Sequence, residues 1–196
     1  MNYPIVEIFD SIQGEGSWLG RPVTFIRMGG CNLHCPWCDT NSSKFRNMSI
    51  VDICRLVSSR DIVITGGEPL IHDLVPLLRA LRGVKGFSRS IAIETNGTQP
   101  TGQIEGLVQW IVASPKPEVD YKLHEGCYPN ELKYVVDGTF TPSVIPDTLW
   151  QKYAGRIWLQ PESGNMQRRW KEAYNYVMQY PGLRVGIQLH KLMGVK

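Results

Sequence analysis

Short apolar runs alternate along the chain with polar segments that contain glycine and proline. The runs are rich in valine, isoleucine and aromatic residues, and several are apolar without interruption. That pattern is typical of strands that are buried on both faces of a parallel sheet. It predicts seven strands, at residues 23–28, 62–65, 91–94, 110–113, 131–136, 157–160 and 184–189.

Between these runs, three segments predict helices, at residues 49–57, 73–81 and 165–179. The first has Ser49 as its N-cap and Asp52 in its first turn, where a carboxylate interacts favourably with the helix dipole. Leu74, Leu77 and Leu78 begin the apolar stripe of the second, at helical spacing. The third is long and amphipathic.

Strands that alternate with crossovers imply right-handed βαβ units and a mainly parallel sheet. The crossovers at 97–109 and 115–130 do not have the pattern of a helix. We therefore expect an α/β fold, an incomplete TIM-like barrel of mainly parallel strands with few crossover helices. At 196 residues, the chain should form a single domain, 1–196, around one sizeable core.

Composition excludes several classes of protein. The net charge is only +3, without the clustered lysine and arginine of a nucleic-acid-binding surface. No stretch is apolar for long enough to span a membrane, and the first ten residues lack the basic start of a signal peptide. We therefore expect a cytoplasmic protein that binds neither nucleic acid nor membranes. In that compartment its five cysteines should be thiols or metal ligands, not disulfides.

The unusual polar motifs follow the predicted strands. A cysteine-rich loop follows the first strand, and TGGEP, ETNGT, SPKP, QPESG and QLHK stand at the ends of the second, third, fourth, sixth and seventh. In barrel-like α/β folds the carboxyl ends of the strands meet on one face, where loops from several strands converge. The motifs therefore predict a site on that face.

Three cysteines lie within eight residues in GGCNLHCPWCDT: Cys31, Cys35 and Cys38. A loop with this spacing can wrap one cubic iron–sulfur cluster and leave one of its four irons without a protein ligand. From the cysteines alone, a structural zinc site is the alternative, with Cys54, Cys127 or His34 as the fourth ligand.

CNLHCPWC, with Trp37 before its last cysteine, resembles the signature of the radical S-adenosylmethionine superfamily, and TGGEP resembles its second motif. The resemblance implies a 4Fe–4S cluster whose open iron chelates S-adenosylmethionine and cleaves it to a 5′-deoxyadenosyl radical. Two glycines allow close backbone approach to this cofactor, and Glu68 can accept a hydrogen bond from its ammonium group. The expected cofactor-binding residues are Trp37, Cys38, Asp39, Gly66, Gly67, Glu68, Glu94, Asn96, Ser114, Pro115, Lys116 and Gln160. For any single loop residue among them, ordinary capping is the alternative.

The N-terminal segment EIFDSIQGEGSWLGRPVTFIR, with CDT after the cysteines, resembles the 7-carboxy-7-deazaguanine synthase family, and SPKP, LQP and HKLMG extend the likeness along the chain. The resemblance implies a lyase of 7-deazapurine (queuosine-type) biosynthesis. Such an enzyme contracts a ring of 6-carboxy-5,6,7,8-tetrahydropterin to give 7-carboxy-7-deazaguanine and ammonia. Another small radical enzyme, such as a glycyl-radical activase, is the alternative, because it uses the same cysteine spacing.

By this resemblance the substrate-binding residues are Ile12, Gln13, Gly14, Glu15, Arg27, Thr65, His190 and Lys196. Arg27 would clamp the substrate carboxylate, Glu15 would pair with guanidine-like N–H donors, and Thr40 would give its hydroxyl to a Mg²⁺ ion. Considered alone, Arg27 could pair with a core carboxylate, Thr40 could cap a turn and His190 could be structural. In relatives the terminal residue, often proline, folds over the substrate with its carboxylate. Here Lys196 replaces that proline, and the resemblance implies that the role persists through the backbone carboxylate.

The resemblance also implies an electron donor, which we expect to be flavodoxin- or ferredoxin-like. Short crossovers leave sheet edges that a second copy of the chain can cover, so we expect a homodimer.

Overall fold

The computed structural model describes residues 1–83 and 88–196, and its strands form one sheet in the order β3-β1-β2-β4-β5-β6-β7-β8-β9. The strands are β1 (Asn2–Ile12), β2 (Pro22–Met28), β3 (Arg46–Ser49), β4 (Asp61–Gly66), β5 (Ser90–Thr95), β6 (Trp110–Ala113), β7 (Glu131–Val136), β8 (Ile157–Pro161) and β9 (Leu183–Val185). From β2 onward, neighbouring strands in this order are parallel. Strand β1 is antiparallel to both of its neighbours, β2 and β3.

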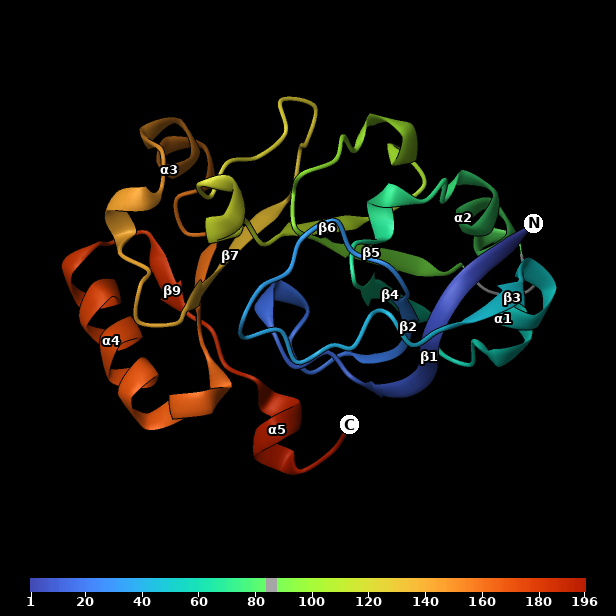
Figure 1. Ribbon diagram of the computed structural model, residues 1–196, viewed down its shortest axis with the longest axis horizontal. Coiled ribbons are helices and arrows are strands. Elements are labelled where there is room, and N and C mark those ends of the chain that lie inside the picture. Colours follow the sequence, from blue (N-terminus) through green and yellow to red (C-terminus); the bar gives the residue numbers. More distant parts are fainter. Residues whose placement is uncertain (84–87) are drawn as a thin grey trace.

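Five α-helices accompany the described part of the sheet: α1 (Ile50–Leu56), α2 (Val75–Arg82), α3 (Asp147–Tyr153), α4 (Met166–Gln179) and α5 (Leu189–Met193). The sheet curves from β3 to β9 without closing (Figure 1). Helices α1 and α2 lie outside one half of the curve and α3 and α4 outside the other, whereas α5 and the C-terminus lie at its mouth. The predicted incomplete barrel is therefore confirmed.

The two crossovers for which no α-helix was expected contain single 3-10 turns, Gly102–Ile104 and Pro117–Val119. Among residues 1–83 and 88–196, no helix combines the length and the apolar character needed to cross a bilayer.

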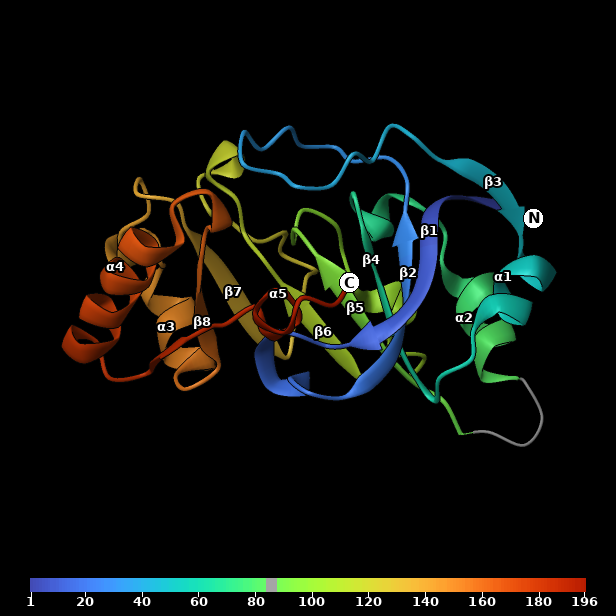
Figure 2. The ribbon, with the colours of Figure 1, turned by 90° about the horizontal axis from the view of Figure 1, so that it is seen from below.

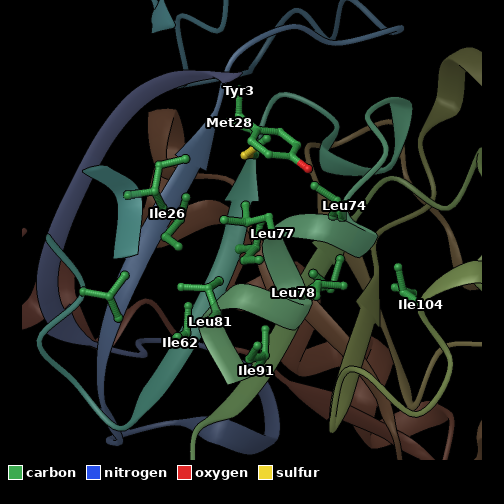
Figure 3. Close-up of a cluster of buried hydrophobic side chains, with 14 of the residues drawn as sticks. Tyr3, Ile26, Met28, Ile62, Leu74, Leu77, Leu78, Leu81, Ile91 and Ile104 are labelled. Atoms are coloured by element: carbon green, nitrogen blue, oxygen red, sulfur yellow. The ribbon is translucent and has the colours of Figure 1, made fainter. Parts of the chain in front are cut away.

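The outer face of the sheet is packed against the helices. Successive side chains of a strand point to opposite faces, and in β2 the outward-facing Ile26 and Met28 are fully buried. Figure 3 shows Leu77 and Leu81 of α2 pointing toward the sheet, beside Ile62 of β4. A second buried cluster lies between β7, β8 and α4 and contains four buried aromatic residues: Tyr121, Tyr134, Phe140 and Tyr153.

The inner face carries polar side chains from the same strands. In the opposite register to the apolar residues lie Arg27 of β2, Thr65 of β4, Glu94 of β5, Lys133 of β7 and Gln160 of β8, all of which line one cavity. Arg27 and Thr65 are direct partners in the sheet. Earlier in the same strands the inner face carries a small apolar cluster that contains Val23, Val63 and Ala92. The strand period therefore divides the molecule into an outer core and an inner face that becomes polar toward the carboxyl ends of the strands.

Helix prediction succeeded where capping and periodicity agree. The helices expected at 49–57, 73–81 and 165–179 correspond to α1, α2 and α4, and Ser49 Oγ accepts a hydrogen bond from the Asp52 amide at 3.2 Å. The strand predicted at 184–189 is wrong beyond Val185. There the Leu189 amide donates to the Gly14 carbonyl at 3.0 Å, and the chain turns into α5.

Four elements were not predicted: β1, β3, α3 and α5. Strand β1 has no continuous apolar run. Its outer face buries Tyr3 and Ile5, and a register shift between Ile5 and Glu7 then turns Glu7 to the inner face. The remaining three are short, and their sequences contain little periodic signal.

We predict that Leu77→Ala lowers the free energy of unfolding by about 2–5 kcal/mol, because the leucine is fully buried between α2 and the sheet. The measurement is urea denaturation followed by circular dichroism. Leu56→Ala is the matched control, since Leu56 ends α1 with 48% exposure and should change the free energy by about 0.5 kcal/mol or less. Equal losses in the two variants would contradict this description of the core.

Candidate active site

A cavity of about 850 Å³ lies inside the curve of the sheet, under the segment that follows β2. Figure 2 shows this segment, coloured light blue, along the edge at which β2 ends. The cavity brings together most of the predicted site residues: Gln13, Glu15, Arg27, Cys31, Cys35, Trp37, Cys38, Asp39, Thr40, Gly66, Gly67, Thr65, Glu94, Asn96, Ser114, Lys116, Gln160, His190 and Lys196. Ile12, Gly14, Glu68 and Pro115 are not among its lining residues.

The glycines of TGGEP connect β4 to the cysteine loop. A Cβ atom on Gly67 would lie 1.8 Å from the Gly30 carbonyl oxygen, and one on Gly66 would lie 2.3 Å from the backbone of Met28. Gly66 also has φ +135°, a conformation that favours glycine. Both glycines are therefore needed for the two loops to pack, in addition to any approach by a cofactor.

Glu68 has partners within the protein that were not predicted. Its side chain is fully buried, and its carboxylate accepts hydrogen bonds from Thr95 Oγ1 at 2.7 Å, the Asn96 amide at 2.6 Å and the Leu70 amide at 2.9 Å. These three bonds leave about one acceptor site of the carboxylate free, and a contact with the cofactor ammonium stays a prediction. The carboxylate fixes the end of β4 against the end of β5.

The three loop cysteines lie on the cavity wall as free thiols. Cys54 belongs to α1 and packs against the first buried cluster. Cys127 is buried in the second cluster, so neither cysteine faces this cavity. Nowhere in residues 1–83 and 88–196 do three His, Cys, Asp or Glu side chains converge on a single-ion site. The zinc alternative therefore lacks the fourth ligand expected from Cys54 or Cys127.

The thiol donors fit a four-iron cluster. Such a cluster is wider than a single ion, so its three ligands need not converge on one point. Burial raises the pKa of the Cys35 thiol to about 12, and a hydrogen bond with Glu118 adds to the effect. This cysteine would therefore be a thiolate only when iron binds it.

Two contacts tie the cysteine loop to the far strands. The Trp37 indole donates to Asp137 Oδ2 at 3.0 Å, and Lys116 Nζ lies 5.2 Å from the centre of the Trp37 ring. Lys116 also donates to Ser114 Oγ at 2.6 Å. Burial, together with the positive charge of Lys133, lowers the pKa of Lys116 to about 8.

One end of the cavity is positively charged. Arg27 Nε pairs with Glu7 Oε1 at 2.9 Å, and Arg27 Nη1 donates to Thr40 Oγ1 at 3.2 Å. Lys196 Nζ pairs with the other oxygen of Glu7 and lies 4.7 Å from the centre of the Phe9 ring. Two cations therefore share one carboxylate, which leaves an excess of positive charge at this end.

A second part of the cavity, formed by residues 13–15 with β4, β5 and β7, carries two carboxylates; we call it the cavity floor. Lys133 Nζ lies 2.5 Å from Glu15 Oε2, and Gln188 Nε2 donates to Glu15 Oε1 at 2.8 Å. Glu94 accepts from Gln13 Nε2 at 2.9 Å and from Thr65 Oγ1 at 2.8 Å. Glu94, expected to bind the cofactor, therefore belongs to the same network as the predicted substrate residues.

His190 closes one side of this floor. A Cβ atom on Gly14 would lie 2.0 Å from His190 Nδ1, so the ring packs directly on the glycine backbone. Burial lowers the pKa of His190, although the charge of Glu15 opposes the effect, and this direction favours the neutral imidazole. Gly14 acts here by leaving space for the ring.

Several lining residues were missed by sequence reasoning, including Glu7, Phe9, Lys133, Gln188 and Lys191. Glu7 belongs to the unpredicted strand β1, and Gln188 and Lys191 flank or belong to the unpredicted helix α5. Lys133 had a usable signal, because a lysine inside the apolar run ELKYVV must face a partner or solvent.

Comparison with known proteins agrees with this geometry. Residues 25–119 match the family model of the radical SAM superfamily. A 7-carboxy-7-deazaguanine synthase from Synechocystis sp. is 37% identical, with 100% of this chain and 95% of that protein covered. The protein of the same name from Aquifex aeolicus is 35% identical, with 97% and 93% covered. The crystal structure of QueE from Escherichia coli superposes with a TM-score of 0.73 at 28% identity, covering 97% of this chain and 95% of that one.

We predict that Gly67→Ala lowers both stability and iron content, because its new methyl group would collide with the Gly30 carbonyl beside the cysteines. The free energy of unfolding should fall by about 1–3 kcal/mol. Reconstituted protein should hold well under the roughly four irons expected of the unmodified chain. Gly102→Ala is the control, since no atom lies within 4 Å of its Cβ position. Full iron content and an unchanged melting temperature for Gly67→Ala would refute the packing argument.

Proposed function

The chain belongs to the 7-carboxy-7-deazaguanine synthase family of radical S-adenosylmethionine enzymes, and from this membership we propose its reaction. It converts 6-carboxy-5,6,7,8-tetrahydropterin to 7-carboxy-7-deazaguanine and releases ammonia. The observation that carries the proposal is the separation of charge in the cavity. Arg27 and Lys196 make one end positive, whereas Glu15 and Glu94 line the floor. The substrate matches this arrangement, with a carboxylate at one end and guanidine-like N–H donors at the other.

Arg27 is suited to hold the substrate carboxylate. A guanidinium has five N–H donors in a planar fork, and the contacts with Glu7 and Thr40 use only part of this set. Lys196 adds a second cation next to the same Glu7. The ammonium side chain of Lys196 can thus contribute where relatives carry proline.

Cys31, Cys35 and Cys38 would hold a 4Fe–4S cluster and leave one iron open. When bound, the cluster supplies the electron that cleaves S-adenosylmethionine to the radical that abstracts hydrogen from the substrate. The chain's own part is to orient the two reactants and exclude water. Gly66 and Gly67 leave room for the cofactor's methionine portion. The cofactor would also contact Asn96, which is nearly buried and hydrogen-bonded to Asn32 in the cysteine loop.

The glycyl-radical activase alternative is less well supported. An activase must accommodate a protein segment, whereas here the charged groups face into a cavity of about 850 Å³, the size of a small-molecule site. The named relatives also align over essentially the whole chain.

We infer that the enzyme works in the cytoplasm, where its thiols stay reduced, and that a flavodoxin- or ferredoxin-like protein supplies electrons. We also infer a homodimer that covers a sheet edge. Because all nine strands share one sheet, we expect residues 1–196 to unfold as a single cooperative domain.

We predict that Arg27→Ala raises the KM for the pterin roughly 10- to 100-fold, the usual effect of losing hydrogen bonds between charged groups. The measurement is anaerobic product formation with cluster, S-adenosylmethionine and reductant supplied. Arg55→Ala is the control, because the Arg55 side chain is 75% exposed on α1, away from the cavity. If the unmodified chain cleaves S-adenosylmethionine but makes no carboxydeazaguanine, the proposed reaction is wrong.

We propose that Thr40 gives its hydroxyl to a Mg²⁺ ion that bridges to the substrate, since Mg²⁺ needs few protein ligands and keeps several waters. In the structure this oxygen lines the cavity and accepts from Arg27. We expect product formation to fall when Mg²⁺ is removed with a chelator and to recover when it is added back. Thr40→Ser should keep this dependence, whereas Thr40→Val should be slow at every Mg²⁺ concentration. A Thr40→Val enzyme that still responds normally to Mg²⁺ would remove Thr40 from the ion's ligands.

A further inference from the structure

Lys133 is a charged residue in the middle of a strand that otherwise contributes to the core. Its neighbours Leu132 and Tyr134 are fully buried on the outer face of β7. The Lys133 side chain points to the inner face, where it is only 15% exposed. A cation that is so little hydrated is costly unless a carboxylate compensates for it, and Glu15 lies 2.5 Å away.

The two partners keep each other ionised. Burial alone would raise the pKa of Glu15, but the charge of Lys133 and hydrogen bonds from Lys133 and Gln188 bring it below its usual range. Burial alone would lower the pKa of Lys133, but the charges of Glu15 and Glu94 raise it. Without Lys133, the desolvation that remains would therefore favour the protonated, neutral form of Glu15.

Glu15 keeps acceptor capacity for a ligand. A carboxylate offers about four lone-pair sites, and Lys133 and Gln188 occupy one on each oxygen. The Glu15 amide donates to Gln13 Oε1 at 3.1 Å, and Gln13 in turn donates to Glu94. One hydrogen-bonded row therefore connects β7, the turn after β1, and β5 across the cavity floor.

We propose that Lys133 is a positioning residue for substrate recognition: it holds the Glu15 carboxylate ionised and in one orientation, ready to accept the N–H donors of the heterocycle. This inference rests on the proposed function, because the pterin is the ligand that Glu15 would meet. A purely structural ion pair would stabilise the fold without affecting how ligand binding depends on pH.

Other charged groups face the same pair. The negative charges of Glu94 and Glu131 raise the pKa of Lys133. His190 lowers the pKa of Glu15, and Lys116 interacts electrostatically with both Glu15 and Lys133. Glu131 is held by Ser17 and by the Trp158 indole at 2.8 Å. Because these groups remain in every Lys133 variant, a comparison with Glu15→Gln is needed to isolate the carboxylate.

The test is equilibrium binding of 6-carboxy-tetrahydropterin to anaerobic, cluster-loaded protein with S-adenosylmethionine and no reductant, from about pH 6 to about pH 9. For Lys133→Met we expect binding to weaken at least about tenfold at the acidic end and to recover as Glu15 ionises with rising pH. Lys133→Arg keeps the charge and should stay within about threefold of the unmodified chain at every pH.

Glu15→Gln should bind weakly without that recovery at high pH. The double variant, Lys133→Met with Glu15→Gln, should bind the pterin only slightly more weakly than Glu15→Gln alone, because the two residues act as a unit. If Lys133→Met does not fold, as judged by its melting curve, Lys133→Gln replaces it, since it keeps a hydrogen-bond donor while removing the charge.

Two results would overturn the inference: unchanged binding in the charge-removing variant, or a loss of the same size at every pH, which is what a structural role gives. Failure of the proposed function gives a different result. In that case the unmodified chain itself does not bind the pterin, whereas a wrong role for Lys133 leaves that binding intact.

Discussion

The alternation of side chains along each strand is the constraint on which the rest of this structure depends. Helices α1 to α4 cover the outer face of the curved sheet, so that face takes most of the apolar residues, such as Ile26 and Leu159. The inner face is then free to carry Arg27, Glu94 and Lys133 toward one cavity. Because a shift of one residue would exchange the two faces, the hydrophobic core itself fixes the register of the site.

Charge burial shapes what the inner face can do. The charged side chains that are mostly buried on this face need a partner of opposite charge. Lys133 has Glu15, and Arg27 has Glu7. These pairings fix where the positive and negative parts of the cavity lie. Recognition of a heterocycle with a carboxylate at one end follows from the same pairs, which is why residues outside the chemistry, such as Lys133, affect binding.

Sequence reasoning succeeded where the signal is local. The Ser49 cap depends on a few adjacent residues and is confirmed. The cysteines and the TGGEP glycines line the cavity, while their contacts with a cluster and a cofactor stay predictions. Sequence reasoning was less complete for Glu68, which looked like a ligand for the cofactor. Its carboxylate also accepts from Thr95 and two backbone amides, a set of partners that the meeting of β4 and β5 creates.

The sequence by itself therefore determined the open, mainly parallel sheet, the cysteine loop and the family to which the chain belongs, because periodicity and motif spacing are properties of neighbouring residues. Tertiary structure alone decided the partners of the charged groups. Lys133 meets Glu15 across 118 positions of the chain, and Lys196 meets Glu7 only because α5 returns to the mouth of the sheet. Such pairs depend on how strands and loops converge in space, and no local pattern encodes that convergence.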